Sequence, residues 1–135
     1  MTDGHDVTPA EADAQTGCPF CRPLPRVLQN ALGYAVYDRA PVNPGHLLII
    51  PFRHVADWFD LSAQEQCALL DLAGLARALL QRERGPDGFN LGVNCGAAAG
   101  QSIFHVHLHL IPRYAGDMAE PLGGVRGVIP ARQRY

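Results

Sequence analysis

Apolar positions along the chain repeat with two different periods and predict a small α+β domain. Five apolar or β-branched runs are typical of strands: 27–32, 34–37, 46–50, 89–94 and 104–111. Between the third and fourth runs, leucine and alanine recur at helical spacing. Ser62 followed by Glu65 is a capping box, and Gly85 with Pro86 ends the pattern, which predicts one helix from about Ser62 to Arg84. This element order predicts an antiparallel five-stranded sheet with one long helix on one face.

The composition divides the chain into two parts. Of the 135 residues, 47% are hydrophobic and 18% are charged, as in ordinary globular proteins. Residues 1–16 carry four acidic residues and no basic residue, so we expect a disordered acidic tail followed by one domain over 17–135. Without those four charges the formal charge changes from −2 to +2. That weak positive charge suits a small anionic ligand, while the net charge of −2 for the whole chain leaves no broad cationic surface for a long nucleic acid.

The sequence favours a cytoplasmic protein without a membrane partner. No apolar run approaches the ~20 residues that cross a bilayer, and the first residues lack the pattern of a signal peptide. Of four cysteines, only Cys18 and Cys21 form a recognisable pair. That pair could be half of a zinc site, a redox dithiol or two ordinary thiols. An acidic stretch before it and Pro23 and Pro25 after it disfavour the strand-to-helix setting of a redox dithiol.

The strongest chemical signal is the run His105-Val106-His107-Leu108-His109. At the strand period of two, its three imidazoles lie on one face and its aliphatic side chains on the other. Two histidines so spaced can ligate one zinc ion, so the spacing alone permits a metal site as well as phosphate chemistry. The preceding Gly100-Gln101-Ser102 supplies flexible backbone and polar side chains that suit phosphate oxygens. His46 could supply a fourth imidazole.

The run from His105 to Ile111 resembles the His-φ-His-φ-His-φ-φ motif of the histidine triad (HIT) family, in which φ is apolar. Other matching segments follow in the family's order: Asp38, 43–46, 50–54, Asn94 and 100–102. Residues 111–117 are similar to the fragile histidine triad and diadenosine polyphosphate hydrolase branch, whereas Asn94 and 100–102 are equally similar to the phosphoramidase branch. The resemblance implies a HIT-like α+β fold and a homodimer that joins two sheets into one of ten strands.

The resemblance also implies a role for each matching residue. His107 would attack an α-phosphorus and form a nucleotidyl-histidine intermediate that water hydrolyses. The other implied catalytic residues are His46, His109, Gln101 and Ser102. The implied nucleotide-binding residues are Asp38, which would accept hydrogen bonds from ribose hydroxyls, Asn94, Gly100 and Phe20. Structural interpretations stay open for three of them, since Asp38 and Asn94 suit turns and Phe20 suits a core.

Some HIT proteins and the related galactose phosphate uridylyltransferases hold zinc through four residues that match Cys18, Cys21, His54 and His105 here. Such a closed site is structural: it would tether the N-terminal loop to the sheet and leave no open position for chemistry. We therefore expect structural zinc and no catalytic metal. The fragile histidine triad branch lacks these ligands, so the set indicates a bacterial zinc-bearing subgroup.

Three interpretations of function remain open at this stage. The first is a hydrolase that cleaves dinucleoside polyphosphates or related adenylyl conjugates at the α-phosphorus. The second is a purine nucleoside phosphoramidase or a nucleotidyltransferase, which would share the covalent intermediate. The third is a nucleotide-binding module without turnover, although the intact His107 weighs against it.

Overall fold

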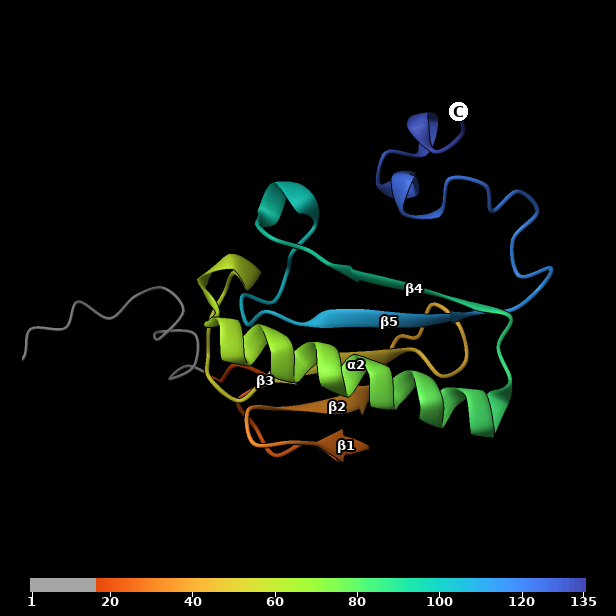
Figure 1. Cartoon of the computed structure of the whole chain (residues 1–135). Coiled ribbons are helices and arrows are strands. Elements are labelled where there is room, and N and C mark those ends of the chain that lie inside the picture. The colour runs from red at the N-terminus through yellow and green to blue at the C-terminus, as the bar shows by residue number, and fades with distance from the viewer. Residues whose placement is uncertain (1–16) are drawn as a thin grey trace, which may run out of the picture.

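The computed structural model describes residues 17–135 and shows one antiparallel sheet with a long helix against it (Figure 1). The strand order is β1-β2-β3-β5-β4. The strands are β1 (Leu28–Gln29), β2 (Gly33–Tyr37), β3 (Leu47–Pro51), β4 (Gly88–Val93) and β5 (Leu108–Arg113). The predicted five-stranded α+β fold is therefore confirmed, with β5 inserted between β3 and β4. The predicted acidic tail lies outside the described residues.

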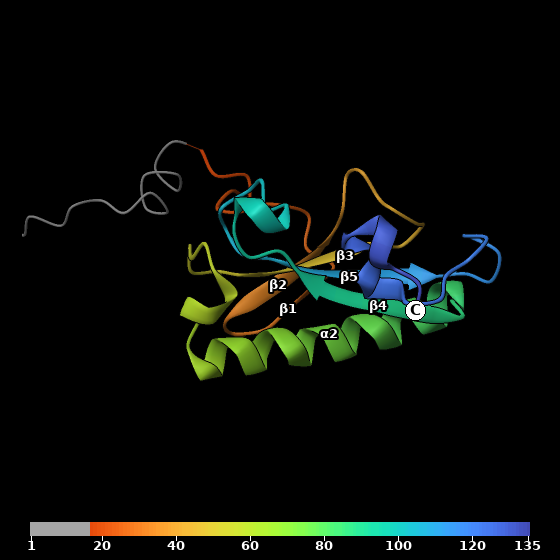
Figure 2. The ribbon, with the colours of Figure 1, turned by 90° about the horizontal axis from the view of Figure 1, so that it is seen from above.

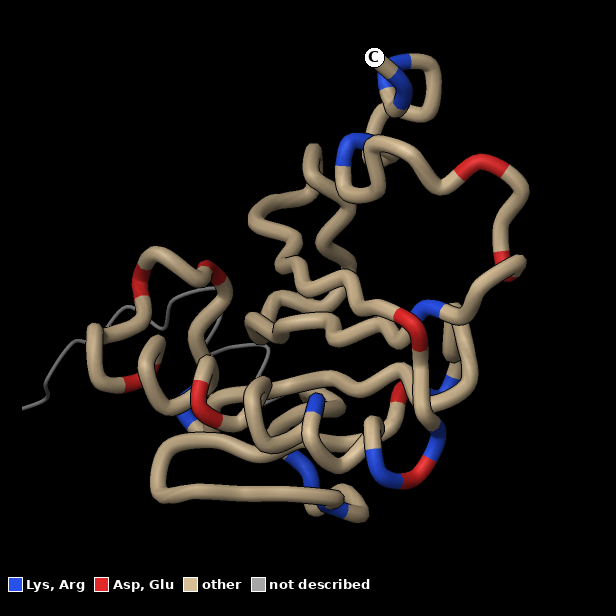
Figure 3. The backbone as a smooth tube through the Cα atoms, turned by 45° about the vertical axis from the view of Figure 1, so that its right-hand side comes forward, with Lys and Arg blue, Asp and Glu red and all other residues tan. Residues whose placement is uncertain are grey.

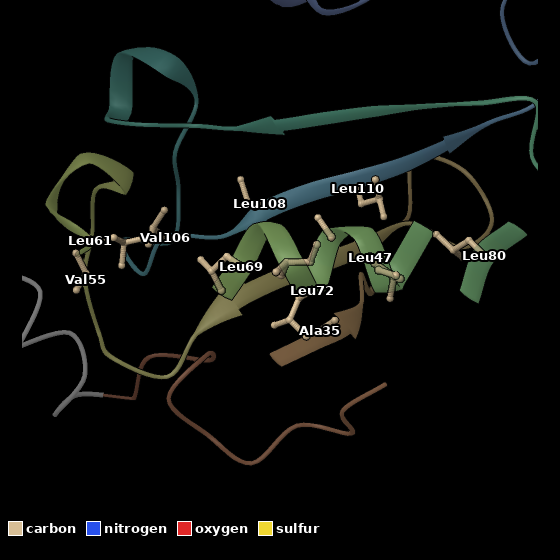
Figure 4. Packing of buried hydrophobic residues seen from close by; sticks show 13 residues of the cluster. Ala35, Leu47, Val55, Leu61, Leu69, Leu72, Leu80, Val106, Leu108 and Leu110 are labelled. Atoms are coloured by element: carbon tan, nitrogen blue, oxygen red, sulfur yellow. The ribbon is translucent and has the colours of Figure 1, made fainter. Parts of the chain in front are cut away.

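Helix α2 (Ala63–Arg84) forms where its sequence signals predict it. The Ser62 hydroxyl accepts a hydrogen bond from the Glu65 N–H, and the Glu65 carboxylate accepts one from the Ser62 N–H. Gly85 closes the other end with a left-handed backbone, φ 56°. The inner face of α2 packs on the sheet through a cluster of buried apolar residues shown in Figure 4, including Leu69, Leu72, Leu47, Leu108 and Leu110. No helix among the described residues is long and apolar enough to cross a membrane.

The other face of the sheet is covered by loops and short 3-10 helices rather than by a second α-helix (Figure 2). These short helices are η2 (Ala97–Ala99), η3 (Gly124–Val128) and η4 (Pro130–Arg132), whereas η1 (Trp58–Asp60) precedes α2 and its Trp58 packs against the cluster beneath that helix. The segment that contains η3 and η4 lies beyond the edge strand β4 (Figure 1), toward the side of the sheet away from α2 (Figure 2). Functional side chains on this face are thus bordered by irregular segments.

The fifth strand begins later than the sequence predicts. β5 starts at Leu108, residues 103–105 form bends and 106–107 are irregular, so the strand predicted from 104 is wrong over its first positions. The Val106 N–H donates to the Val55 carbonyl instead of joining the sheet. Leu108 pairs with Ile49, and two positions further along β3 lies Pro51, which has no N–H to extend the ladder. The predicted alternation survives, because Val106, like Leu108, packs in the cluster beneath α2.

Candidate functional site

Four aromatic rings form a row on the face of the sheet opposite α2. The ring centroids of Phe20 and His107 are 4.9 Å apart, and those of His107 and His109 are 5.0 Å apart. The row continues from His109 to His46 at 5.2 Å. His109 projects from β5, where it pairs with Leu48, and His46 directly precedes β3. The structure therefore brings together the imidazoles that the sequence assigned to one site.

A backbone hydrogen bond fixes the tautomer of the His107 ring. Its Nδ1 lies 2.9 Å from the backbone carbonyl oxygen of His105, so Nδ1 carries the proton and donates it. Its Nε2 then keeps the lone pair. Burial lowers the pKa of His107 from its ordinary value, which keeps the imidazole neutral near pH 7. A neutral imidazole with a fixed tautomer is the form that a covalent mechanism requires.

His46 and His109 form a chain of hydrogen bonds with a defined direction. The Val42 N–H donates to His46 Nδ1 over 3.1 Å, so His46 carries its proton on Nε2. That Nε2 lies 3.0 Å from His109 Nδ1 and donates to it. His109 therefore holds its own proton on Nε2. Burial, followed by repulsion from His107 and His46, lowers the pKa of His109 to about 4, which makes it a neutral hydrogen-bond donor.

Asp38 lies at the edge of the same group. One carboxylate oxygen accepts a hydrogen bond from the Ala40 N–H over 2.9 Å, as a turn residue does, while the other lies 3.6 Å from His46 Nε2. Its charge partly opposes the burial that lowers the pKa values of His46, His107 and His109. Asp38, His46 and His109 are among the residues that line a pocket of about 640 Å³. The turn interpretation and the pocket interpretation of Asp38 are thus compatible.

The three loop residues that precede the histidine run, Gly100, Gln101 and Ser102, differ in burial and hydrogen bonding. Gln101 is buried: its Oε1 accepts from the Gly96 N–H, and its Nε2 donates to the carbonyls of Ala56 and Ile103. Because both amide protons have partners, Gln101 shapes this loop in the structure described. Gly100 ends η2 with a φ of 94°, which favours glycine. Ser102 is exposed, and its side chain makes no hydrogen bond to the described residues.

Asn94 and Phe20 lie in different places. Asn94 follows β4 and lines the pocket that contains Asp38. Phe20 is buried against Tyr34, Leu48 and other residues of a second apolar cluster, and it does not line that pocket. The Phe20 ring instead packs edge-on against His107. Both residues remain candidates for nucleotide contact, Asn94 as a lining residue of the pocket and Phe20 as a neighbour of His107.

Cys18, Cys21, His54 and His105 converge as the resemblance implies, and one ligand atom from each lies within 4.8 Å of the others. His105 Nδ1 is 3.5 Å from both sulfur atoms and 3.0 Å from His54 Nδ1. His105 Nε2 lies 2.8 Å from the Pro51 carbonyl and donates to it, which leaves Nδ1 as the ligand atom. Two sulfur and two nitrogen donors fit tetrahedral zinc.

A second group, Asp38, His46 and His109, also has ligand atoms within 4.8 Å of one another, but its hydrogen bonds disfavour a metal. A ligating His46 Nε2 would have to lose its proton to Nδ1. That Nδ1 faces the Val42 N–H, so a proton on Nδ1 would place two N–H donors, those of His46 and Val42, against each other. This group therefore suits a hydrogen-bond relay, whereas the cysteine-containing group suits zinc.

The structure adds pocket residues that sequence reasoning missed. Arg113 lines the pocket and is held by Asp117 and by Asn90, to which its Nη1 donates over 2.7 Å. The alternation along β5 could have indicated Arg113, since 109, 111 and 113 share a face. Other missed lining residues come from the segment of η3 and η4: Gly124, Val125, Gly127, Val128 and Gln133. No sequence motif marks that segment.

Comparison with known proteins identifies the family. The HIT domain family model matches residues 23–116. An AP-4-A phosphorylase of Mycobacterium tuberculosis is 39% identical over 92 residues, which cover 67% of this chain and 47% of that protein. An adenosine 5'-monophosphoramidase of Schizosaccharomyces pombe is 36% identical over 102 residues, covering 71% of this chain and 74% of that protein. The chain thus spans about half the length of the mycobacterial relative.

Solved structures agree with this assignment. A HIT family protein from Bacillus anthracis superposes with a TM-score of 0.70 at 35% identity, covering 74% of this chain and 75% of that one. A zinc-bound histidine triad family protein from Mycobacterium smegmatis gives a TM-score of 0.66 at 27% identity, covering 81% of this chain and 76% of that one. The chain belongs to the HIT domain family, as its triad motif predicts.

Proposed function

We propose that this HIT protein is a nucleotide hydrolase that cleaves dinucleoside polyphosphates or related adenylyl conjugates at the α-phosphorus through a nucleotidyl-His107 intermediate. The observation that carries the proposal is the hydrogen bond from His107 Nδ1 to the His105 carbonyl, which leaves Nε2 as a neutral nucleophile. The pocket beside His109 gives a nucleotide room to bind.

The proposed reaction has two displacements at phosphorus. His107 Nε2 forms a bond to the α-phosphorus, and the bond from phosphorus to the leaving group breaks, with its electron pair going to that group. Water then attacks the same phosphorus and releases a proton to solvent, while the N–P bond breaks with its electron pair returning to His107 Nε2, so that a nucleoside monophosphate leaves and His107 is restored. The His109 Nε2–H donates a hydrogen bond to a phosphate oxygen, where negative charge increases as phosphorus becomes five-coordinate.

The relatives support this class of chemistry and also define the second candidate. One relative is named for phosphorolysis of AP-4-A and another for a monophosphoramidase. A phosphorylase or nucleotidyltransferase would form the same intermediate and differ only in the acceptor of the second displacement. Phosphoramidase activity would differ in the first leaving group, an amine. Homodimerisation and a cytoplasmic location remain predictions of the sequence.

We also propose that Cys18, Cys21, His54 and His105 hold one structural zinc ion. Bound zinc would supply folding free energy and crosslink the loop at Cys18 and Cys21 to the sheet. His105 would then be a ligand rather than a catalytic group, while its carbonyl fixes the His107 tautomer. The zinc-bound histidine triad protein from Mycobacterium smegmatis supports this assignment.

The test of the proposed function compares His107→Ala and His109→Ala with the parent protein. The substrates are diadenosine tetraphosphate and adenosine 5'-phosphoramidate, with product analysis. We expect His107→Ala to lower kcat on the order of a thousandfold or more, because the nucleophile is gone, and His109→Ala to have a smaller effect. Parental turnover by His107→Ala would refute the mechanism. A parent that binds AMP but cleaves neither substrate would indicate a binding module.

A further inference from the structure

Two segments beside the histidine row, the loop 38–46 and the turn 114–117 that follows β5, are joined by a side chain (Figure 1). Asn43 Nδ2 donates to the Pro112 carbonyl over 3.1 Å and to Asp117 Oδ2 over 2.7 Å. These acceptors lie 69 and 74 positions further along the chain. The amide group of Asn43 therefore ties the loop to the end of β5.

Asp117 is a strong acceptor at this junction. Acidic and basic positions are interspersed along the backbone (Figure 3), and Asp117 forms an ion pair of 2.8 Å with Arg113, four residues earlier. The Tyr114 N–H also donates to Asp117 Oδ2. The Arg113 guanidinium, followed by the Tyr114 N–H, holds the pKa of Asp117 far below its ordinary value. Asp117 thus stays charged, and a charged acceptor bonds the Asn43 amide more strongly than a neutral one.

The tied loop supplies the backbone group that orients His46. Val42 directly precedes Asn43 and donates its N–H to His46 Nδ1 over 3.1 Å. The Asn43 carbonyl accepts from the His46 N–H over 3.1 Å. Because Val42 is adjacent to Asn43, the hydrogen bonds of the Asn43 side chain limit how far the Val42 N–H can move from His46. The proton of His46 consequently stays on Nε2, from which it is donated to His109 Nδ1 over 3.0 Å.

We infer that Asn43 and Asp117 are positioning residues that set the tautomers of His46 and His109. Without the bond between Asn43 and Asp117, the Val42 N–H would be free to leave His46, and His46 could carry its proton on Nδ1. His109 would then donate from Nδ1 to His46. Its Nε2 would face a phosphate oxygen with a lone pair instead of a proton. The kinetic consequence of this inference rests on the proposed function, which assigns the His109 Nε2–H to a phosphate oxygen.

The nucleotide-binding candidate on the same loop is held separately. The Asp38 N–H donates to the His46 carbonyl over 2.9 Å, which continues the pairing of β2 with β3 by one residue. Asp38 therefore stays with the sheet when the tip of the loop loosens. A variant of Asn43 should keep the affinity for substrate and lose the part of catalysis that depends on the donor from His109.

Tautomer-sensitive NMR tests the inference without turnover. The ¹⁵N shifts of the ring nitrogens of His46 and His109 separate a protonated from an unprotonated nitrogen. The variants are Asn43→Ala, Asp117→Ala and the double variant. The matched control is Asp87→Ala, which removes a different side-chain acceptor from the same turn. We expect mixed tautomers at both histidines in the first three proteins and the parental pattern in Asp87→Ala.

Kinetics with diadenosine tetraphosphate measure the consequence for the reaction. We expect Asn43→Ala to lower kcat about tenfold and to change KM by less than about twofold, because the lost donor matters most as phosphorus becomes five-coordinate. The effects of Asn43→Ala and Asp117→Ala should be non-additive in the double variant, since both remove one hydrogen bond. Asp87→Ala should keep the parental kcat.

Three results would overturn the inference: parental ¹⁵N shifts in Asn43→Ala, additive effects of the two substitutions, or a loss of the same size in Asp87→Ala. The last would indicate a general loosening of the turn. If Asn43→Ala does not fold, the shifts in Asp117→Ala decide the question, because that variant removes the same bond from the other side. Failure of the proposed function is distinguishable. Mixed tautomers in the variants of a parent that cleaves no substrate would refute the hydrolase proposal alone.

Discussion

At the scale of residues, backbone groups determine what each histidine of the triad can do. The His105 carbonyl fixes the proton of His107 on Nδ1, and the Val42 N–H fixes the proton of His46 on Nε2. The sequence predicted which side chains meet, because alternation along a strand needs only residue types. It could not predict these partners, because they depend on how the Val42 loop and the bend before β5 fold. The sequence also assigned Gln101 to phosphate contact, because residue types alone do not show backbone partners. In the structure the Gln101 amide group donates hydrogen bonds to the carbonyl oxygens of Ala56 and Ile103.

The neutral state of His107 predicts the pH dependence of kcat/KM. Burial lowers the pKa of His107, so the acid limb should lie below pH 6.5, the ordinary value. Asp38 partly opposes this effect through its negative charge, so Asp38→Asn should move the limb to still lower pH. Asp71→Asn, on the exposed side of α2, is the control and should leave the limb in place. A pH-rate profile in which Asp38→Asn moves the limb upward would contradict this electrostatic account.

At the scale of elements, sequence patterns predicted the helix ends, whose hydrogen-bond partners are close in the sequence. They did not predict segments whose position depends on contacts with distant residues. The capping box and Gly85 gave both ends of α2 because their partners lie within a few residues. The run over 27–32 forms only the short β1, because Asn30 turns the chain by accepting from the Leu32 and Gly33 N–H groups. The segment of η3 and η4 has no periodic pattern, so its position beyond β4 depends on contacts such as those of Arg126 and Gly123.

Gly123 provides a test of that segment. Gly123→Ala should displace the segment of η3 and η4, because its Cβ would collide with the Gln133 carbonyl, whereas Gly116→Ala has open space at a similar φ of 85°. Both variants carry the strain of a positive φ, so their difference isolates the collision. We expect faster proteolysis within 124–135 only in Gly123→Ala. Equal proteolysis rates in the two variants would count against a segment held in place by the packing of Gly123 against Gln133.

At the scale of the whole molecule, the two faces of the sheet differ in role: one packs the apolar core, and the other carries the candidate site. One face carries the apolar cluster beneath α2, and the other carries the histidines, the cysteine loop and the pocket. The proposed zinc site joins these roles, because His105 is both a proposed ligand and the residue whose carbonyl orients His107. The sequence predicted this ligand set only through family resemblance, since residues 18, 21, 54 and 105 come together through the folded sheet.

Zinc content and thermal stability test the structural site. We expect one zinc ion per chain in protein prepared without chelator. Cys18→Ser should lose it and lower Tm on the order of 10 °C, because metal binding contributes directly to folding. Cys67→Ser is the matched control, since Cys67 is exposed on α2 and lies outside the cluster, and it should keep both zinc and Tm. Well-folded parent protein without zinc would disprove the assignment.

The central claim is that His107 Nε2 carries the nucleotide between the two displacements. Rapid quenching of the reaction with diadenosine tetraphosphate, followed by peptide mass spectrometry under alkaline conditions that preserve an N–P bond, tests it most directly. We predict a nucleoside monophosphate adduct on His107 that forms and decays at rates consistent with turnover and is absent in His107→Ala. Turnover without an adduct, or an adduct on His109 or His46, would contradict the account.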